Sequence, residues 1–395
     1  MRKNKKENKA GTSESKRSFK FLRNIIISVV CLLIVANILN LAPGYRRDRY
    51  GDVTNIIVNS ENLTEELRYP IYINEKGTVY LSMNDIGNIF ETTIYYEEKY
   101  ETVVTIKETK VGSMNKNDKI LTVNGSEINV LDTIIEMNNT IYIPISEMKL
   151  VYNIDVEYSK ENNRVVIDRL DKAMTKADVI KDTVIKYKSR SLSKDVATIS
   201  KGEEVSCFYT TKRGWTSVRT HSGLFGYIRK ENLSNQYVVR EDMNQKITTK
   251  EISLTSNKFS ILENGEMKDI SIENIFKLSP EGLLEVAEIE NEDEEIWAIV
   301  SNENFETISK KALEDYKTRS AIINIIVNLA IGNKVSGIVI KANNIEDYNT
   351  FKKFMFELSP RLRELGISSA VYKTPSIKSN NFKNIIDYIL IEEGK

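Results

Sequence analysis

The sequence predicts a multidomain chain with an N-terminal transmembrane helix, an α+β repeat module, a small all-β barrel and an incomplete β/α barrel. Three observations lead to this prediction: an uncharged apolar run near the N-terminus, an internal repeat in the first half, and strands that alternate with helical segments in the last third. A chain of 395 residues has room for several domains, each with its own core.

The formal net charge of zero hides an asymmetry along the chain. The first 44 residues carry nine Lys and Arg residues against two glutamates, and the remainder carries 47 basic and 54 acidic residues. The tail is therefore +7 and the main body −7. This balance argues against nucleic acid as the partner of the main body.

Residues 24–44 contain no charge, and their core IIISVVCLLIVANILNLA is long enough to cross the hydrocarbon layer. Because the basic segment 1–23 precedes this run, we expect a cytoplasmic tail, a single span of the cell membrane and an extracytoplasmic main body. A cleaved signal peptide is the alternative. The 23-residue leader is long for one and no convincing small-x-small site follows, so we expect an uncleaved signal anchor.

Residues 69–168 contain an internal repeat with an offset of 62 residues. TVYLSMNDI from Thr78 aligns with TIYIPISEM from Thr140, and each copy predicts a short strand, a helix and a hairpin. Both copies resemble the copper amine oxidase N-terminal-like domain of bacterial surface proteins. The stretch has neither histidine nor cysteine, the residues that copper prefers, so we expect a stalk or adhesion module with no metal and no cofactor.

Residues 177–238 predict a small all-β barrel, because short strands alternate with polar turns. Lys201-Gly202, the GWTSV stretch from Gly214, and Gly223 to Ile228 resemble the motifs of the bacterial SH3-like domain, whose members commonly bind cell-wall peptides. The resemblance implies ligand binding at Trp215 and Tyr227. The alternative is that both aromatic side chains fill the core or edge of the barrel.

The single histidine and the two cysteines limit the available chemistry. His221 lies in a polar turn, and one histidine cannot build a multi-histidine metal site, nor does this one suit a serine triad. Cys31 lies in the apolar run, which leaves Cys207 alone outside it. We expect Cys207 to be a small buried apolar residue with no redox role.

Residues 246–395 predict a parallel sheet built from β/α units. Apolar runs at 296–300, 337–342, 368–372 and 387–391 are separated by helical segments, and 252–256 is a candidate earlier strand. An apolar stripe from Tyr348 to Leu365 indicates a helix packed on the sheet. Pro360 lies within that stripe and is expected to kink or interrupt the helix.

The order and wording of this region, from WAIVSNENFE through SGIVIKANN to IDYILI, resemble glycoside hydrolase family 18 in its bacterial spore and cell-wall version. That family is a (β/α)₈ barrel that cleaves β-1,4 links beside an N-acetylated sugar, and its fourth strand carries D-x-x-D-x-D-x-E. Its acidic positions fall here on Ser336, Val339, Lys341 and Asn343. An asparagine amide has no proton to transfer and a lysine opposes a developing cation, so the resemblance implies a degenerate motif without catalytic residues.

Two neighbouring features bear on this interpretation. Glu346 and Asp347 are acidic, but their spacing after Asn344 indicates the first turn of a helix with Asn344 as its cap. The chain also stops soon after DYILI, where the family continues with further strands. We therefore expect a barrel that cannot close, with an open edge that needs another chain or a local rearrangement to cover it.

Taken as a whole, the sequence resembles membrane-anchored cell-wall proteins of Gram-positive, clostridial-type bacteria. We expect a non-catalytic cell-envelope protein that binds or scaffolds peptidoglycan, with cell-wall glycan, a wall peptide or another envelope protein as its partner. The first alternative is an active peptidoglycan or chitin-type glycosidase. The second is a truncated remnant whose incomplete barrel does not fold alone.

Overall fold

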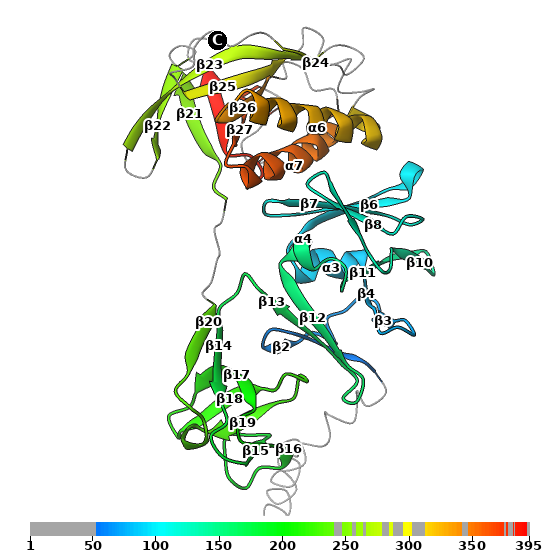
Figure 1. Ribbon diagram of the computed structural model, residues 1–395, viewed down its shortest axis with the longest axis vertical. Coiled ribbons are helices and arrows are strands. Elements are labelled where there is room, and N and C mark those ends of the chain that lie inside the picture. The colour runs from blue at the N-terminus through cyan, green and yellow to red at the C-terminus, as the bar shows by residue number, and fades with distance from the viewer. Residues whose placement is uncertain are drawn as a thin grey trace, which may run out of the picture. The chain divides into compact units, whose positions relative to one another are not determined.

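The computed structural model describes residues 53–240, 247–254, 258–263, 266–278, 284–286, 295–301, 313–341, 347–374, 377, 382 and 384–392. Its contacts divide the chain into two compact units (Figure 1). One comprises Lys176–Tyr237 with Glu161–Arg164 and the residues up to Asn55, and the other comprises Ile56–Lys160, Val165–Thr175 and Val238–Lys395. The described residues contain four apolar clusters, which begin at Ile56.

The two copies of the repeat pack against each other through equivalent residues. Strand β4 (Val79–Ser82) pairs antiparallel with β11 (Thr140–Pro144), and the register sets Leu81 opposite Ile143, its equivalent 62 residues later. Phe90 and Tyr152, which are also 62 residues apart, stack with ring centroids 5.0 Å apart. The copies are therefore related by a local two-fold arrangement, and each buries its apolar side chains against the other.

Each copy then contributes a short helix, α3 (Met83–Ile89) or α4 (Lys149–Tyr152), and a hairpin. The hairpins join two separate sheets, while β4 and β11 belong to a third. The first sheet contains β12 (Ile154–Ser159), β13 (Arg164–Arg169), β1 (Asn55–Val58) and β2 (Glu61–Asn62). The second contains β5 (Thr93–Glu97), β6 (Thr102–Lys107), β7 (Lys110–Asn115), β8 (Ile120–Val123) and β9 (Ser126–Asn129). In the third, β10 (Ile135–Met137) and β3 (Tyr72–Ile73) flank β11 and β4.

The segment predicted as an all-β barrel lies in a seven-stranded sheet. In sheet order the strands are β16 (Asp195–Ile199), β15 (Thr183–Lys186), β19 (Phe225–Arg229), β18 (Trp215–Arg219), β17 (Glu204–Thr210), β14 (Met174–Asp178) and β20 (Tyr237–Arg240). Val205, Cys207, Val218 and Ile228 project into its apolar cluster. Burial raises the pKa of the Cys207 thiol to about 11, which confirms that this cysteine is a small apolar core residue.

The apolar runs of the C-terminal region form strands β25 (Glu295–Ser301), β26 (Gly337–Lys341), β27 (Ser368–Tyr372) and β28 (Tyr388–Glu392), which are parallel neighbours. Strand β21 (Lys250–Leu254) pairs parallel with β28 at one end of the sheet. At the other end, β23 (Glu266–Leu278) pairs parallel with β25 and antiparallel with β22 (Lys258–Glu263) and β24 (Leu284–Val286).

Apolar side chains cover both faces of this sheet. Helices α6 (Tyr316–Gly332) and α7 (Tyr348–Glu364) lie along one face and bury the larger cluster (Figure 1). On the opposite face, Trp297 fills the centre of a second cluster directly over Gly337. A Cβ atom at position 337 would lie 2.3 Å from the indole, so the tryptophan requires a glycine on the neighbouring strand.

The predicted fold class is wrong: the described chain is mostly β-sheet with few helices. None of the helices in the described ranges is long and apolar enough to cross a membrane, and the predicted span 24–44 lies outside those ranges. The C-terminal sheet is mixed: β21, β28, β27, β26, β25 and β23 are parallel neighbours, and β22 and β24 pair antiparallel with β23. Strand β21 occupies the edge of β28 that the sequence left uncovered, because the backbone groups of an edge strand gain hydrogen bonds when another strand pairs with them.

Two local predictions around α7 are also corrected. The helix cap is Asp347, whose carboxylate accepts from the backbone N–H groups of Asn349 and Thr350, and not Asn344, which lies outside the described residues together with Glu346. Pro360 does not interrupt the helix, which runs unbroken to Glu364. Pro360 is buried among core residues near the C-terminal end, where packing against the sheet compensates for one missing backbone hydrogen bond.

Candidate functional site

Two of the four residues at the degenerate motif positions, Val339 and Lys341, lie on β26. Ser336 precedes the strand, and its backbone N–H donates to Ile296 at the amino end of the sheet. Val339 is completely buried in the apolar cluster around Trp297. Lys341 ends the strand, and Asn343 lies outside the described residues. Strand β26 therefore projects an apolar side chain and an amine from the positions where family 18 has carboxylates.

At the carboxyl end of the sheet, Lys341 lies against an aromatic ring. Its ammonium is 5.4 Å from the ring centroid of Tyr372, which ends the adjacent strand β27. Glu392 ends β28, and burial together with the charge of Glu392 raises the pKa of the Tyr372 phenol. The phenol thus stays protonated at neutral pH, and the arrangement can donate hydrogen bonds to a ligand's oxygen atoms.

In the all-β unit, Trp215 lies on the face of the sheet opposite the apolar cluster. Val218 projects into that cluster, so the alternation along β18 directs Trp215 to the other side. The indole is only 5 % exposed, because the guanidinium of Arg229 on the paired strand lies over it, with its carbon atom 4.4 Å from the ring centroid. The Trp215 ring therefore packs beneath the Arg229 guanidinium, which shields it from solvent.

Tyr227 lies on this same outer face, two residues from Arg229 along β19. Its hydroxyl is 2.6 Å from that of Tyr209 on β17, and the Tyr209 side chain is exposed to solvent. Phe208 and Phe225 make a second ring pair between the same two strands, with centroids 6.1 Å apart. A bulge in β17 after Cys207 lets both consecutive aromatic residues reach this face. We call the five residues Phe208, Tyr209, Trp215, Phe225 and Tyr227 the aromatic face.

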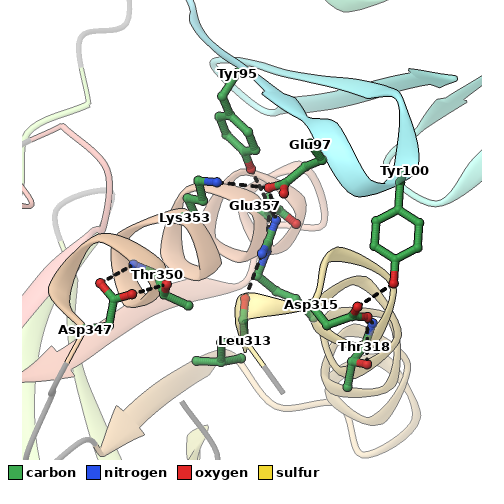
Figure 2. A network of polar contacts seen from close by, with 11 residues as sticks. Tyr95, Glu97, Tyr100, Leu313, Asp315, Thr318, Asp347, Thr350, Lys353 and Glu357 are labelled. Atoms are coloured by element: carbon green, nitrogen blue, oxygen red, sulfur yellow. Dashed lines mark hydrogen bonds and ion pairs between the residues drawn. The ribbon is translucent and has the colours of Figure 1, made fainter. Parts of the chain in front are cut away.

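A third group of polar residues joins the sheet β5–β9 of the repeat module to helices α6 and α7 (Figure 2). At its centre is Arg319 of α6, whose side chain is fully buried. The guanidinium donates to Glu357 of α7 at 2.9 Å, to Glu97 of β5 at 2.8 Å and to the carbonyl of Leu313 at 2.7 Å. The three nitrogen atoms of the guanidinium thus donate to acceptors from three separate segments.

Further contacts complete this interface. The hydroxyl of Tyr95 donates to the Glu357 carboxylate, and Lys353 donates to Glu97 at 3.1 Å. Burial raises the pKa of the Glu357 carboxyl, and the Arg319 guanidinium and the Tyr95 hydroxyl oppose that rise by donating to it. The arrangement contains acid, amine and phenol groups. These groups form hydrogen bonds and ion pairs with one another, which is the pattern of a structural connection and not of a substrate site.

Asp315, the N-cap of α6, extends the same interface to Lys99 and Tyr100 of the repeat module. Its carboxylate accepts from the Lys99 ammonium at 2.6 Å and from the Tyr100 hydroxyl, and it also accepts from the backbone of Thr318. Hydrogen bonds from Lys99 and Tyr100 hold the pKa of this carboxyl well below its usual range. A helix cap is therefore also an ion-pair partner of the module.

No group of three or more His, Cys, Asp and Glu side chains suited to a metal ion occurs among the residues that the structure describes. His221 is exposed in the turn between β18 and β19.

Comparison with known proteins supports one part of the sequence interpretation directly. Residues 57–167 match the sequence model of the copper amine oxidase N-terminal domain family, which confirms the resemblance found in the two copies. The match covers the repeat module only. No curated protein matches the chain.

Among solved structures, the chain is weakly similar to several glycan-cleaving enzymes. A sporulation-specific glycosylase from Bacillus subtilis is 16 % identical with a TM-score of 0.27, over 31 % of this chain and 50 % of that one. A class V chitinase from Pseudomonas fluorescens is 18 % identical with a TM-score of 0.27, over 30 % and 44 %. The spore cortex-lytic enzyme SleL from Bacillus megaterium is 11 % identical with a TM-score of 0.28, over 43 % and 44 %. The chain spans half or less of the length of each, and likenesses at this level assign it no activity.

Sequence reasoning identified Trp215 and Tyr227 but missed the residues that complete their surroundings. Tyr209 contacts Tyr227, and Arg229 contacts Trp215. Both lie on the strands next to the one that begins with the GW motif. The alternation of side chains along those two strands could have identified them. Glu357 was also missed. It follows directly on the apolar stripe of α7 between Phe356 and Leu358, and a lone acid within such a stripe indicates a buried partner.

Proposed function

We propose that this chain is a cell-envelope protein that binds cell-wall glycan or peptide without cleaving it. The observation that carries the proposal is the chemistry of β26. Val339 is buried among apolar residues and Lys341 places an amine where a glycosidase of the family that the sequence resembles needs a carboxylate. Neither side chain is a carboxylic acid, which argues against hydrolysis by the family's route at this strand.

The aromatic face supports the binding half of the proposal. Sugar rings and short peptides both pack on aromatic side chains, and hydroxyl groups beside the rings supply hydrogen bonds that fix orientation. Tyr209 and Tyr227 offer such hydroxyls, and their mutual hydrogen bond together with burial raises the pKa of Tyr227 to about 12. The Tyr227 phenol therefore remains protonated across the whole physiological pH range.

The test uses residues 53–395, which carry all four apolar cores, in two assays. We expect the protein to sediment with purified cell-wall sacculi and to leave no clear band on a peptidoglycan zymogram. Replacing Tyr209 and Tyr227 together by alanine should weaken sedimentation about thirtyfold, because each of the two packed aromatic rings contributes on the order of 1 kcal/mol. Wild-type protein that stays in the supernatant would refute the binding claim.

A matched control is Tyr72→Ala, which removes an exposed tyrosine from the repeat module. We expect this variant to sediment like the wild type. If Tyr72→Ala and the double variant lose sedimentation equally, the aromatic face is not the binding surface.

The second candidate is a peptidoglycan or chitin-type glycosidase that acts through a carboxylate elsewhere at the strand ends. Glu392 favours it, because this acid ends β28 beside Tyr372 at the carboxyl edge of the parallel sheet. A zymogram band that disappears in Glu392→Gln would establish this candidate and overturn the non-catalytic one. A band that persists in Glu392→Gln would overturn both assignments of the site.

A further inference from the structure

The all-β unit is basic, although the whole chain is neutral. Residues 177–238 contain eleven Lys and Arg residues against six Asp and Glu residues. Part of this excess is concentrated in two connections. The loop 187–194 between β15 and β16 contains Lys188, Arg190 and Lys194, and the turn 211–214 between β17 and β18 contains Lys212 and Arg213, with no acid in either. The unit thus has an electrostatic character that the overall composition conceals.

Arg229 joins these two connections into one surface. Its guanidinium donates to the carbonyl of Arg213 at 3.1 Å and to the hydroxyl of Ser191 at 3.3 Å, while its plane covers Trp215. Lys230 donates its backbone N–H to the carbonyl of Gly214 at 2.9 Å. We call the surface formed by Arg190, Lys194, Lys212, Arg213 and Lys230 around Arg229 the basic edge. The nearest acids in sequence are Asp195, which pairs with Lys186, and Glu231.

The loop 187–194 also displays an apolar side chain at its tip. Leu192 is 98 % exposed, the highest exposure of any large apolar residue among those described. The loop is held by its own hydrogen bonds: Tyr187 donates to the carbonyl of Lys194 at 2.9 Å, and the backbone N–H of Lys188 donates to the Ser193 hydroxyl at 2.8 Å. The loop therefore holds Leu192 in an exposed position, outside the apolar cluster of the same unit.

We propose that the basic edge and Leu192 together form a contact site for the surface of an anionic phospholipid membrane. The cations match the lipid phosphates, each contributing attraction at the headgroup level. The leucine decides between a membrane and a soluble polyanion, because an aqueous polymer offers it no apolar phase, whereas the acyl boundary of a bilayer removes it from water. This contact adjoins the aromatic face, because Arg229 covers Trp215, but Leu192, Arg190 and Lys212 lie outside that face.

Vesicle sedimentation with residues 53–395 tests the proposal. The chain should bind vesicles of equal parts phosphatidylglycerol and phosphatidylcholine, should not bind pure phosphatidylcholine, and should be released by high salt. Leu192→Ser should weaken binding about tenfold, because it removes one inserted side chain. Arg190→Glu combined with Lys212→Glu should weaken it at least about thirtyfold, because attraction is replaced by repulsion at two positions.

Two matched controls keep the result specific. Leu131→Ser removes an exposed leucine from the repeat module, and Lys76→Glu with Lys160→Glu makes the same change of net charge there. We expect both to bind like the wild type.

Three outcomes would overturn the proposal: Leu192→Ser and Leu131→Ser binding equally well, the two charge variants binding equally well, or the wild type preferring soluble polyphosphate to vesicles. Sacculus sedimentation of the same variants should not change. The membrane contact and the aromatic face therefore fail or succeed independently.

Discussion

Two regions of the β/α domain carry charged side chains, and they differ in how those charges are satisfied. At the interface with the repeat module, Arg319 is fully buried and its donors meet two carboxylates and a carbonyl. At the carboxyl end of the sheet, Lys341 is partly exposed and lies over the ring of Tyr372. The first region binds the domain to its neighbour, and the second pairs a partly exposed cation with an aromatic ring.

The difference shows where a buried charge is tolerated in this molecule. An ion removed from water is stable only if its partners satisfy every donor and acceptor, which fixes its position closely. The interface meets that condition through groups from β5, α6 and α7. The strand end does not need to meet that condition, because Lys341 remains in contact with solvent. Variants in the two regions should therefore behave differently.

The largest expected effect is at the interface. Arg319→Met leaves the buried Glu357 carboxylate without its cation, and we expect the free energy of unfolding of residues 53–395 to fall by about 3–5 kcal/mol in urea titrations. Adding Glu357→Leu removes the second charge and should restore much of the loss.

The matched variant at the strand end is Lys341→Met, which removes a cation that lies over an aromatic ring and leaves no buried carboxylate unpaired. We expect it to change stability by less than about 0.5 kcal/mol. Equal losses for Arg319→Met and Lys341→Met would show that the two regions do not differ in the way the structure indicates.

An intermediate effect is expected within the strand that leads to Lys341. Gly337→Ala places a Cβ atom 2.3 Å from the Trp297 ring, so we expect a loss of about 1–3 kcal/mol and a changed near-ultraviolet spectrum of the tryptophan. Gly332→Ala is the control, because nothing lies within 4 Å of the new atom and an alanine at this helical position is favourable. A neutral Gly337→Ala would contradict the packing of this face.

A smaller effect than at Gly337 is expected at the cap of α7. Asp347→Ala removes the acceptor for two backbone N–H groups and should cost about 1 kcal/mol, whereas Asp347→Asn keeps an acceptor oxygen and should cost less.

The pH dependence of stability tests the capping role of the Asp347 carboxylate. Its hydrogen bond from Thr350 lowers the pKa of the carboxyl in the folded state, so its stabilising contribution is present above the unfolded value of about 3.9 and is lost as the pH falls through the folded value. Both variants should reduce this loss in acid, as measured by thermal unfolding at several pH values. An unchanged acid profile would show that Asp347 does not titrate in this way.

The sequence predicted much of the local structure because local signals carried it. Continuous apolar runs located β25 to β28, and the 62-residue offset located the two copies of the module. Trp215 and Tyr227 were found through the GW motif, and the structure places them on one face of neighbouring strands. Their use in binding remains a prediction that the sacculus assay tests.

Other features could not be predicted, because they depend on contacts between distant segments. The helix of α7 continues through Pro360 because packing against the sheet outweighs the local preference of proline. Asp347 caps that helix where Asn344 was expected, since either polar side chain satisfies the local rule. Glu97 and Arg319 are 222 residues apart, and no local pattern relates them.

The sequence alone determined the module, the strands of the β/α region and the lack of carboxylates at the degenerate motif, because residue identity and short-range periodicity decide each of these. Only the tertiary structure decided that β21 covers the edge of β28, that Arg319 joins α6 to the module, and that Leu192 is displayed beside a basic edge. Those features depend on how edges, buried charges and exposed loops are satisfied by residues far away in the chain, and that is settled when the chain folds.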